Sequence, residues 1–184
     1  MLKNKVVVIT GGSGLLGEQF IREVVNQGGI GIIADIDEKS GNKLMNLLSN
    51  NEAKKNVEFV KIDITSEKSI ESAISYLDKK YGKIDAIVNN AYPRNSNYGK
   101  HFFDVNHKDF VENLGLNLGG YFTTSQVFAK YFKRQGYGNI VNVSSIYGVI
   151  APKFEIYKDT SMTMPVEYSV IKSGLIHLTK YMAK

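Results

Sequence analysis

Short apolar runs alternate along the chain with longer segments in which apolar residues recur every three or four positions. The short runs are rich in β-branched residues and nearly continuous in apolar side chains, as in strands that are covered on both faces. The longer segments have the spacing of helices that cover a sheet. We predict strands at 6–10, 30–35, 57–62, 86–89 and 139–143, and helix faces at Leu16, Phe20 and Val24, at Leu44, Leu47 and Leu48, at Ile70, Ile74 and Leu77, and at Val111, Leu114, Leu118 and Phe122.

This alternation is typical of repeated βαβ units. We therefore predict the α/β class, with a Rossmann-type doubly wound parallel sheet, helices on both of its faces, and a single nucleotide-binding domain over residues 1–184. Two connections, 92–106 and 145–167, are longer than is usual in a compact domain. Both follow the carboxyl end of a strand, where open sheets bind ligands, so we expect them to form the substrate loops.

A glycine-rich turn follows the first predicted strand at residues 10–17, Thr-Gly-Gly-Ser-Gly-Leu-Leu-Gly. It fits GxGxxG from Gly12 and TGxxGxxG from Thr10. Such a turn lets the backbone approach a pyrophosphate, whose charge is favoured by the free N–H groups at a helix N-terminus. A strand before the turn and a helix after it are the context that this mechanism requires, so we predict that the turn binds a dinucleotide.

Asp35 ends the second predicted strand about 20 residues beyond the glycines, where a carboxylate binds the hydroxyls of the adenosine ribose. A ribose phosphate would meet this negative charge, and Ile36 supplies no basic partner, so we predict NAD(H) in preference to NADP(H). Asp37 is interpreted as a loop acid or a helix cap. Asp63, which closes the third strand, is either a partner of the adenine amino group or a cap of the next helix.

These features occur together with Asn89-Asn90-Ala91, Asn117, Ser144-Ser145 and Tyr168-x-x-x-Lys172, in the order found in short-chain dehydrogenases/reductases, and the chain resembles that family over its whole length. The resemblance implies that Tyr168 is the acid/base, that Lys172 supports it, that Ser145 holds the substrate oxygen and that Asn117 completes a tetrad. It also implies a homodimer or homotetramer formed through the helices that contain Asn117 and Tyr168. The expected cofactor-binding residues are Gly11, Ser13, Gly14, Leu15, Leu16, Gly17, Asp35, Ile36, Asp63, Ile64, Asn90, Ala91, Tyr168 and Lys172.

Hydride transfer between a secondary alcohol and a ketone needs a group that removes or delivers the hydroxyl proton. A tyrosine with an ordinary pKa of about 10 is a poor base near neutrality. An ammonium at Lys172, one helical turn from Tyr168, favours the phenolate and can lower its pKa by about 1–3 units. Tyr76 and Lys80 have the same spacing, but they precede the fourth strand, so we interpret Tyr76 as a packing residue and Lys80 as a solvated side chain.

Alternatives stay open for two members of the tetrad. Ser144 competes with Ser145, because a serine after a strand often only forms a turn or a cap. The alternative for Asn117 is a simple hydrogen bond to the backbone, which a buried amide requires. The histidines have no metal-ligand spacing, so we predict no metal; they are His101, His107 and His177.

Charge and composition argue against several other classes of protein. The formal net charge is +5, but Lys and Arg are scattered, so we expect no nucleic-acid partner. The absence of cysteine excludes disulfides and thiolate catalysis. No apolar run reaches the roughly 18 residues of a membrane helix, and the N-terminus has no signal-peptide pattern, so we expect no membrane partner and a cytoplasmic location.

Three features depart from the common family pattern: Leu15 in place of a glycine, Tyr92 directly after Asn-Asn-Ala, and the long interval before Tyr168. The stretches 89–95 and 145–168 resemble bacterial oxidoreductases encoded with flagellin-modification and nonulosonate-sugar genes. We therefore hypothesise a small polar substrate, such as an amino sugar, a sugar phosphate or a nucleotide sugar. The loop residues offered for it are Arg94, Asn95, Asn97, Lys100, His101, Pro152, Lys153, Phe154, Tyr157, Lys158, Met162, Met164 and Pro165.

The sequence ends at Lys184, within the helix that begins near Tyr168, whereas members of the family continue into further strands and a Pro-Gly segment. The fifth strand would then be an uncovered apolar edge, so we expect a C-terminally incomplete domain whose last strands are missing. Two other functions stay open. One is a nucleotide-binding module without catalysis. The other is a nucleotide-sugar epimerase or dehydratase, because Gly14 supplies the glycine spacing of that branch.

Overall fold

The computed structural model describes residues 1–49 and 56–184. These residues divide into two compact units, which we describe separately. The first unit contains residues 1–91 and 123–143, and the second contains residues 92–122 and 144–184.

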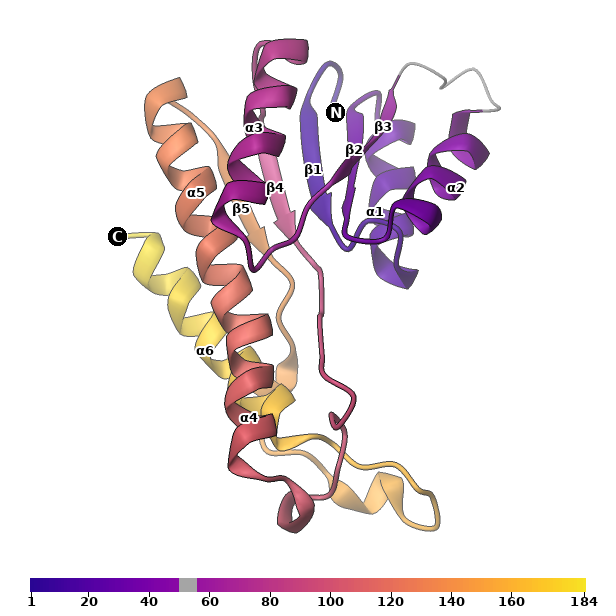
Figure 1. The fold of residues 1–184 in the computed structure, drawn as a ribbon, viewed down its shortest axis with the longest axis vertical. Helices are drawn as coiled ribbons and strands as arrows, with labels where there is room; N and C mark the ends of the chain where they lie inside the picture. Colours follow the sequence, from indigo (N-terminus) through magenta and orange to yellow (C-terminus); the bar gives the residue numbers. More distant parts are fainter. Residues whose placement is uncertain (50–55) are drawn as a thin grey trace. The chain divides into compact units, whose positions relative to one another are not determined.

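The first unit is built on a parallel sheet of five strands in the order β3-β2-β1-β4-β5 (Figure 1). The direction of strand order reverses between β1 and β4, which is where open α/β sheets bind ligands at their carboxyl edge. The strands are β1 (Val6–Thr10), β2 (Ile30–Asp35), β3 (Val57–Lys61), β4 (Ala86–Asn89) and β5 (Asn139–Asn142). The sequence-based prediction of a doubly wound parallel sheet is confirmed, and β3 and β5 each end one residue before the predicted boundary.

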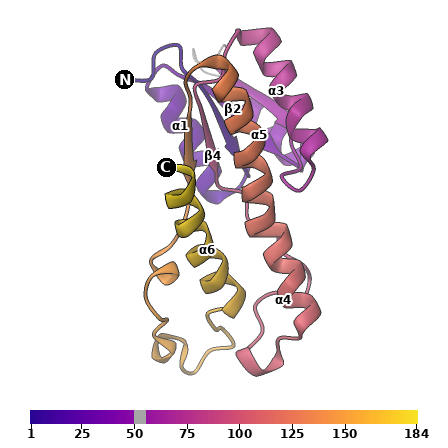
Figure 2. The ribbon, with the colours of Figure 1, turned by 90° about the vertical axis from the view of Figure 1, so that its left-hand side faces the viewer.

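Helices cover both faces of this sheet because successive side chains of each strand point to opposite faces. Val6 and Val8 of β1 belong to a core shared with α3 (Glu67–Tyr81) and residues 123–135 of α5 (Gly120–Gln135). Val7 and Ile9 belong to a second core, shared with α1 (Leu15–Asn26) and α2 (Glu38–Ser49). Figure 2 shows the strands between α1 on one side and α3 and α5 on the other.

The predicted helix faces are correct for α3 and only partly correct for α1 and α2. Ile70, Ile74 and Leu77 are buried as expected, but Leu16 and Leu47 are each 55% exposed. The buried side of α1 is Gly17, Ile21 and Val24, and that of α2 is Gly41, Leu44 and Leu48. A glycine lies on each buried face because a neighbour packs directly on the helix; a Cβ atom at Gly41 would lie 2.2 Å from the Phe59 ring.

The second unit consists of helical segments and the two long connections. The predicted helix around Leu114 and Leu118 is present but is interrupted by a π-helical turn, η2 (Gly115–Gly119), between α4 (His107–Leu114) and the start of α5. Val111 and Phe122, expected to cover a sheet, are 51% and 48% exposed. The long connections contain η1 (Phe102–Asp104), η3 (Ile146–Gly148) and η4 (Phe154–Tyr157), and the last helix is α6 (Val166–Met182).

Glu58 on β3 is the centre of a polar cluster that explains the second Tyr-x-x-x-Lys pattern. Its carboxylate accepts hydrogen bonds from the hydroxyl of Tyr76 (2.5 Å), the ammonium of Lys80 (2.6 Å) and the hydroxyl of Tyr81. Burial raises the pKa of Glu58, but the three bonds together lower it below its ordinary value. Lys80 is exposed to solvent, as predicted, but it also pairs with the mostly buried carboxylate of Glu58, which the sequence did not indicate.

We expect Tyr81→Phe to lower the free energy of unfolding by about 1–2 kcal/mol, because it removes one donor from a carboxylate that cannot replace it with bulk water. Urea unfolding followed by circular dichroism measures this loss. Tyr181→Phe is the matched control, since Tyr181 is 78% exposed. Equal stability of the two variants would contradict the role given to the Glu58 cluster.

No helix within residues 1–49 and 56–184 is long and apolar enough to cross a membrane.

Candidate functional site

The glycine-rich turn joins β1 to α1 at the carboxyl edge of the sheet. Gly11 has a φ of +62°, and a Cβ atom there would lie 2.8 Å from the Cα atom of Ala91. A Cβ atom at Gly17 would lie 2.1 Å from the carbonyl oxygen of Gly11. Gly14 precedes α1 and has no capping side chain, so the first N–H groups of the helix are available to an anion. These residues fit a dinucleotide pyrophosphate.

Hydrogen bonds between the ends of β1 and β4 hold this turn in place. The amide of Asn90 donates to the carbonyl oxygens of Thr10 (3.0 Å) and Gly11 (3.2 Å). The hydroxyl of Thr10 accepts from the backbone N–H groups of Asn90 (3.0 Å) and Ala91 (3.2 Å). Asn90 and Ala91, predicted to contact a cofactor, therefore also set the path of the backbone at Gly11.

Asp35 lies beside the same turn, at the end of β2. Its carboxylate accepts hydrogen bonds from the backbone N–H (3.1 Å) and the hydroxyl (2.5 Å) of Ser13. Ile36 is 60% exposed and presents an apolar side chain next to it. Asp37 accepts hydrogen bonds from the backbone N–H groups of Lys39 and Ser40 at the start of α2. Of the two interpretations, loop acid and helix cap, the helix cap is therefore correct.

Asp63 and Ile64 follow β3 and have different surroundings. The Asp63 carboxylate accepts from the N–H (2.9 Å) and the hydroxyl (2.7 Å) of Thr65. The cap of α3 is Ser66, which accepts from Ser69, so the capping alternative for Asp63 is wrong. Ile64 is buried in the core, so only its backbone is open to a ligand. Leu15 and Leu16, by contrast, are exposed at the start of α1.

The second unit brings Tyr168 and Lys172 together on α6. They are one helical turn apart, and the Nζ atom of Lys172 lies 5.6 Å from the centroid of the Tyr168 ring. Lys172 is only 4% exposed, and burial lowers its pKa to about 8. An amine with a pKa in this range changes its charge near neutral pH, which suits a group that adjusts the acidity of a neighbouring phenol.

Asn117 lies in the π-helical turn of the same unit and is fully buried. Its amide donates to the carbonyl oxygens of Pro93 and Asn113, the latter at 3.2 Å. The backbone hydrogen bonds considered as an alternative for this residue are therefore present. Its Oδ1 atom has no hydrogen-bond partner among the described residues. A buried acceptor of this kind is open to a ligand or a water.

The two serines after β5 have different partners. The hydroxyl of Ser144 donates to the carbonyl oxygen of Lys172 (3.0 Å), so its proton fixes the backbone of α6. The hydroxyl of Ser145 accepts from the N–H of Tyr147 (3.2 Å) at the start of η3, which leaves its own proton to donate. This difference favours Ser145 over Ser144 as a group that donates to a substrate oxygen.

Comparison with known proteins places these features in one family. The family model described as short chain dehydrogenase matches residues 5–184. The chain belongs to the short-chain dehydrogenase family. It is 43% identical to the "Post-translational flagellin modification protein A" of Campylobacter coli, over 100% of this chain and 72% of that protein. It is 35% identical to the "7alpha-hydroxysteroid dehydrogenase" of Bacteroides fragilis, over 98% of this chain and 65% of that protein.

A solved structure shows the same relation. The crystal structure of a short-chain dehydrogenase from Leptospira borgpetersenii "with bound NAD+" has a TM-score of 0.81 and 30% sequence identity to this chain. The match covers 99% of this chain and 65% of that one. The chain thus spans about two thirds of the relatives that it matches, and the family contains members that bind NAD+.

This member of the short-chain dehydrogenase family has aromatic residues around Lys172 that the sequence did not mark as functional. The Lys172 Nζ atom lies 5.2 Å from the ring centroid of Tyr92 and 5.6 Å from that of Tyr121. The rings of Tyr92 and Tyr168 are 5.5 Å apart. Tyr92 was noticed only as a departure from the family pattern after Asn-Asn-Ala, and Tyr121 gave no signal beyond its place near Asn117.

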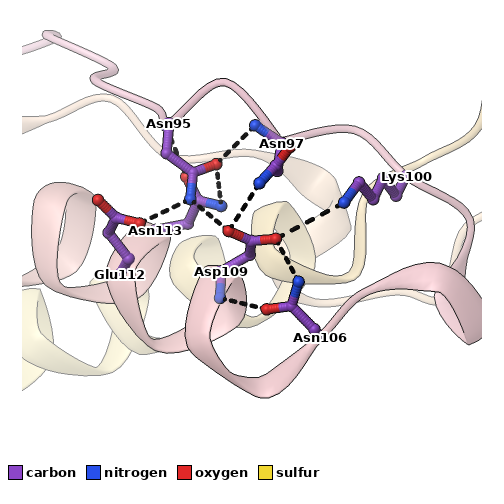
Figure 3. A network of polar contacts seen from close by, with 7 residues as sticks. All are labelled: Asn95, Asn97, Lys100, Asn106, Asp109, Glu112 and Asn113. Carbon is purple, nitrogen blue, oxygen red and sulfur yellow. Dashed lines mark hydrogen bonds and ion pairs between the residues drawn. The ribbon is translucent and has the colours of Figure 1, made fainter.

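A polar network centred on Asp109 holds the first long connection against α4 (Figure 3). The carboxylate accepts from the amides of Asn95 (3.1 Å), Asn97 (3.1 Å) and Asn106 (2.6 Å) and pairs with Lys100 (3.6 Å). Asn95 and Asn113 also bond to each other reciprocally. Asn95, Asn97 and Lys100, offered above as substrate groups, are therefore bound within the loop itself.

The two long connections enclose a cavity of about 500 Å³ in the second unit. Most of its lining is apolar. The long connections were expected to offer polar groups to a substrate, and the lining of this cavity does not match that expectation. Ser169, which follows Tyr168, is among the lining residues, and its hydroxyl is buried without a hydrogen-bond partner within the described part of the chain. The cavity is lined by His101, Phe102, Phe103, Pro152, Phe154, Thr163, Met164, Val166 and Ser169.

The Asp109 network predicts an acid-dependent loss of stability. The amide of Asn97, followed by Asn106, Lys100 and Asn95, lowers the pKa of Asp109 below its usual range. A lowered folded-state pKa contributes stability above the unfolded value of about 3.9 and loses it as the pH falls through the folded value. Asp109→Asn should therefore destabilise the protein near pH 7, and the difference from the native chain should shrink below about pH 4.

Urea unfolding at pH 7 and at pH 3 measures this difference. Asp104→Asn is the control, because Asp104 is exposed on η1. If Asp109→Asn lowers the free energy of unfolding as much at pH 3 as at pH 7, the charge of the Asp109 carboxylate is not what stabilises the protein, and the prediction is wrong.

Proposed function

We propose that this chain is the nucleotide-binding and catalytic part of an NAD-dependent oxidoreductase that interconverts a secondary alcohol and a ketone. The observation that carries the proposal is the pair formed by Tyr168 and the buried Lys172 on α6. A separate support is the glycine-rich turn with Asp35 beside it, because this surface is suited to a dinucleotide. Residues 1–184 are proposed to act as a single domain, with a cytoplasmic location.

The proposed chemistry assigns one role to each member of the tetrad. Bound NAD(H) would exchange a hydride at C4 of its nicotinamide. In oxidation the phenolate of Tyr168 removes the proton of the substrate hydroxyl, and in reduction the phenol of Tyr168 delivers a proton to the ketone oxygen. The Lys172 ammonium stabilises the phenolate form in both directions. Ser145 donates its free proton to the same oxygen. Asn117 holds the loop carbonyl at Pro93 and presents its unpartnered Oδ1 atom to a ligand or water.

The proposed preference for NAD(H) over NADP(H) rests on Asp35 and Ile36. The carboxylate of Asp35 lies where the adenosine ribose is bound in dinucleotide folds, and its present partner, Ser13, is a neutral group. A ribose phosphate there would be repelled by the carboxylate, and the exposed side chain of Ile36 cannot neutralise it.

A sugar or sugar phosphate is the proposed class of substrate. It is supported by the 43% identity to a protein named for flagellin modification, which exceeds the 35% identity to one named as a steroid dehydrogenase. The apolar cavity between the long connections does not itself select a polar molecule. A sugar panel and a panel of steroids and aliphatic alcohols therefore need to be assayed side by side, and turnover of the second panel alone would overturn this part of the proposal.

We also propose a homodimer or homotetramer. An open surface on α4, η2, the start of α5 and α6 is almost wholly apolar, and it includes the half-exposed Val111 and Phe122. Exposed apolar patches rimmed by polar residues mark association sites. The glycines of this surface have no side chains, so a helix of a second copy can approach the backbone closely. The surface consists of Val111, Leu114, Gly115, Leu118, Gly119, Phe122, Gly174 and Leu178.

The cofactor proposal is tested by titrating the purified chain with NADH and with NADPH, following nicotinamide fluorescence. We expect tighter binding of NADH. Asp35→Ala should weaken NADH binding about tenfold or more and remove the preference over NADPH, because two ribose hydroxyls lose a charged acceptor. Tyr168→Phe should lose turnover and keep most of its NADH binding, because it removes only one hydroxyl of the expected cofactor-binding set.

Asp37→Ala is the matched control for Asp35→Ala, since it removes a nearby carboxylate that caps α2. It should leave the preference unchanged. Tighter binding of NADPH than of NADH by the native chain would contradict the assignment of Asp35.

The association proposal is tested with Phe122→Asp, which places a charge in the apolar surface. Light scattering coupled to size-exclusion chromatography should show the native chain as a dimer or tetramer and the variant as a monomer. Leu47→Asp is the control, because Leu47 is equally exposed but lies on α2. A monomeric native chain would contradict the proposal.

A further inference from the structure

Tyr92 is the first residue of the long connection that follows β4, and its side chain is aromatic. Its ring centroid lies 5.5 Å from that of Tyr168, with the planes inclined at 57°. Its hydroxyl pairs with that of Tyr98 at 3.0 Å, and the two rings meet edge to face. This pair of contacts fixes the direction in which the ring face of Tyr92 points.

That ring face is turned toward the Lys172 ammonium. Among the described residues, the Tyr92 ring is nearer to the Nζ atom, at 5.2 Å, than the rings of Tyr121 and Tyr168, which both lie at 5.6 Å. A cation within about 6 Å of an aromatic face is attracted by the negative charge density of the ring, and the attraction is strongest where water is excluded. Lys172 meets this condition, because it is 4% exposed.

We propose that Tyr92 is a positioning residue that holds the Lys172 ammonium, through its ring face, in reach of Tyr168. This inference rests on the proposed role of Tyr168 and Lys172. The charge of Lys172 supports the phenolate only while the ammonium stays protonated and close to Tyr168. Burial acts against the protonated form, and the aromatic faces act in its favour.

Tyr92 acts here as a neutral ring and not as a second base. Burial, with the Tyr98 hydroxyl as the next cause, raises the pKa of Tyr92 far above its ordinary value. Burial likewise raises the pKa of Tyr121. Three titratable side chains of the described residues have their rings close to Lys172: Tyr92 from the long connection, Tyr121 from α5 and Tyr168 from α6. Tyr98 bonds to Tyr92, and Glu167 precedes Tyr168 on α6.

A direct measurement of the Lys172 pKa tests the inference without substrate or cofactor. The native chain is labelled with trace acetic anhydride between pH 6 and pH 10, and the labelled fraction at Lys172 is read by mass spectrometry, with the exposed Lys43 as an internal reference. Only the neutral amine reacts, so the midpoint of labelling gives the pKa. Tyr92→Leu should lower this midpoint by about one unit, because the protonated form loses an aromatic face.

Tyr92→Phe is the matched control. It removes the bond to Tyr98 but keeps the ring, so the midpoint should stay at the native value. A midpoint in Tyr92→Leu that equals the native one would overturn the proposal. So would a rise, because a side chain that serves only to fill space would, when shortened, admit water and reduce the effect of burial. If Tyr92→Leu does not fold, Tyr92→Met fills the same space without a ring and is measured instead.

NADH titration of the same variants separates this inference from the proposed function. Normal NADH binding by Tyr92→Leu together with a lowered Lys172 midpoint supports the positioning role. Failure of the native chain to bind NADH would count against the proposed function and leave the labelling result to decide the role of Tyr92.

Discussion

The contact between the end of β1 and the end of β4 is the constraint on which the proposed nucleotide-binding surface depends. Gly11 lies so close to Ala91 that a side chain at position 11 would collide with the backbone there. Thr10 and Asn90 exchange hydrogen bonds across this contact. The turn that is proposed to bind the pyrophosphate is therefore shaped by contacts with a strand that is distant in sequence. Its glycines are needed for packing before any ligand binds.

Much of the fold could be predicted from the sequence because a parallel sheet covered on both faces produces short, continuous apolar runs. All five strands were located within one residue of their ends. The rotation of the helices was harder to predict. Leu16 and Leu47 continue an apolar pattern but lie on the outer side, because glycines at positions 17 and 41 mark the faces that pack most closely. Glycine does not count as an apolar side chain in such a pattern, so the pattern does not mark it as buried. Its small size is nevertheless what lets a neighbour pack directly against the helix.

The candidate site was likewise predictable only in part from the sequence. Tyr168, Lys172, Asn117 and Ser145 were found by their order along the chain, and the second unit contains all four. Their partners could not be found in this way. Tyr92 lies 80 residues before Lys172 in the sequence, and nothing in its local pattern indicates that its ring meets the ammonium. The Asp109 network was missed for a related reason, since Asn95 and Asn97 were interpreted as substrate groups and nothing in the sequence showed that α4 supplies a carboxylate to them.

The π-helical turn at Gly115–Gly119 lies between α4 and α5, where it adds a residue to the helical stretch. A π turn contains one residue more than an α-helical turn, and such turns occur frequently at functional sites. Because the extra residue is accommodated as a local bulge, loss of one residue here would let the segment return to α-helical geometry while the helix on either side keeps its direction. The amide of Asn117, which donates to the carbonyl oxygens of Pro93 and Asn113, would lose the bulge that holds it. A deletion in this part of the chain would therefore act mainly on one buried amide, and the faces of the flanking helices would stay in place.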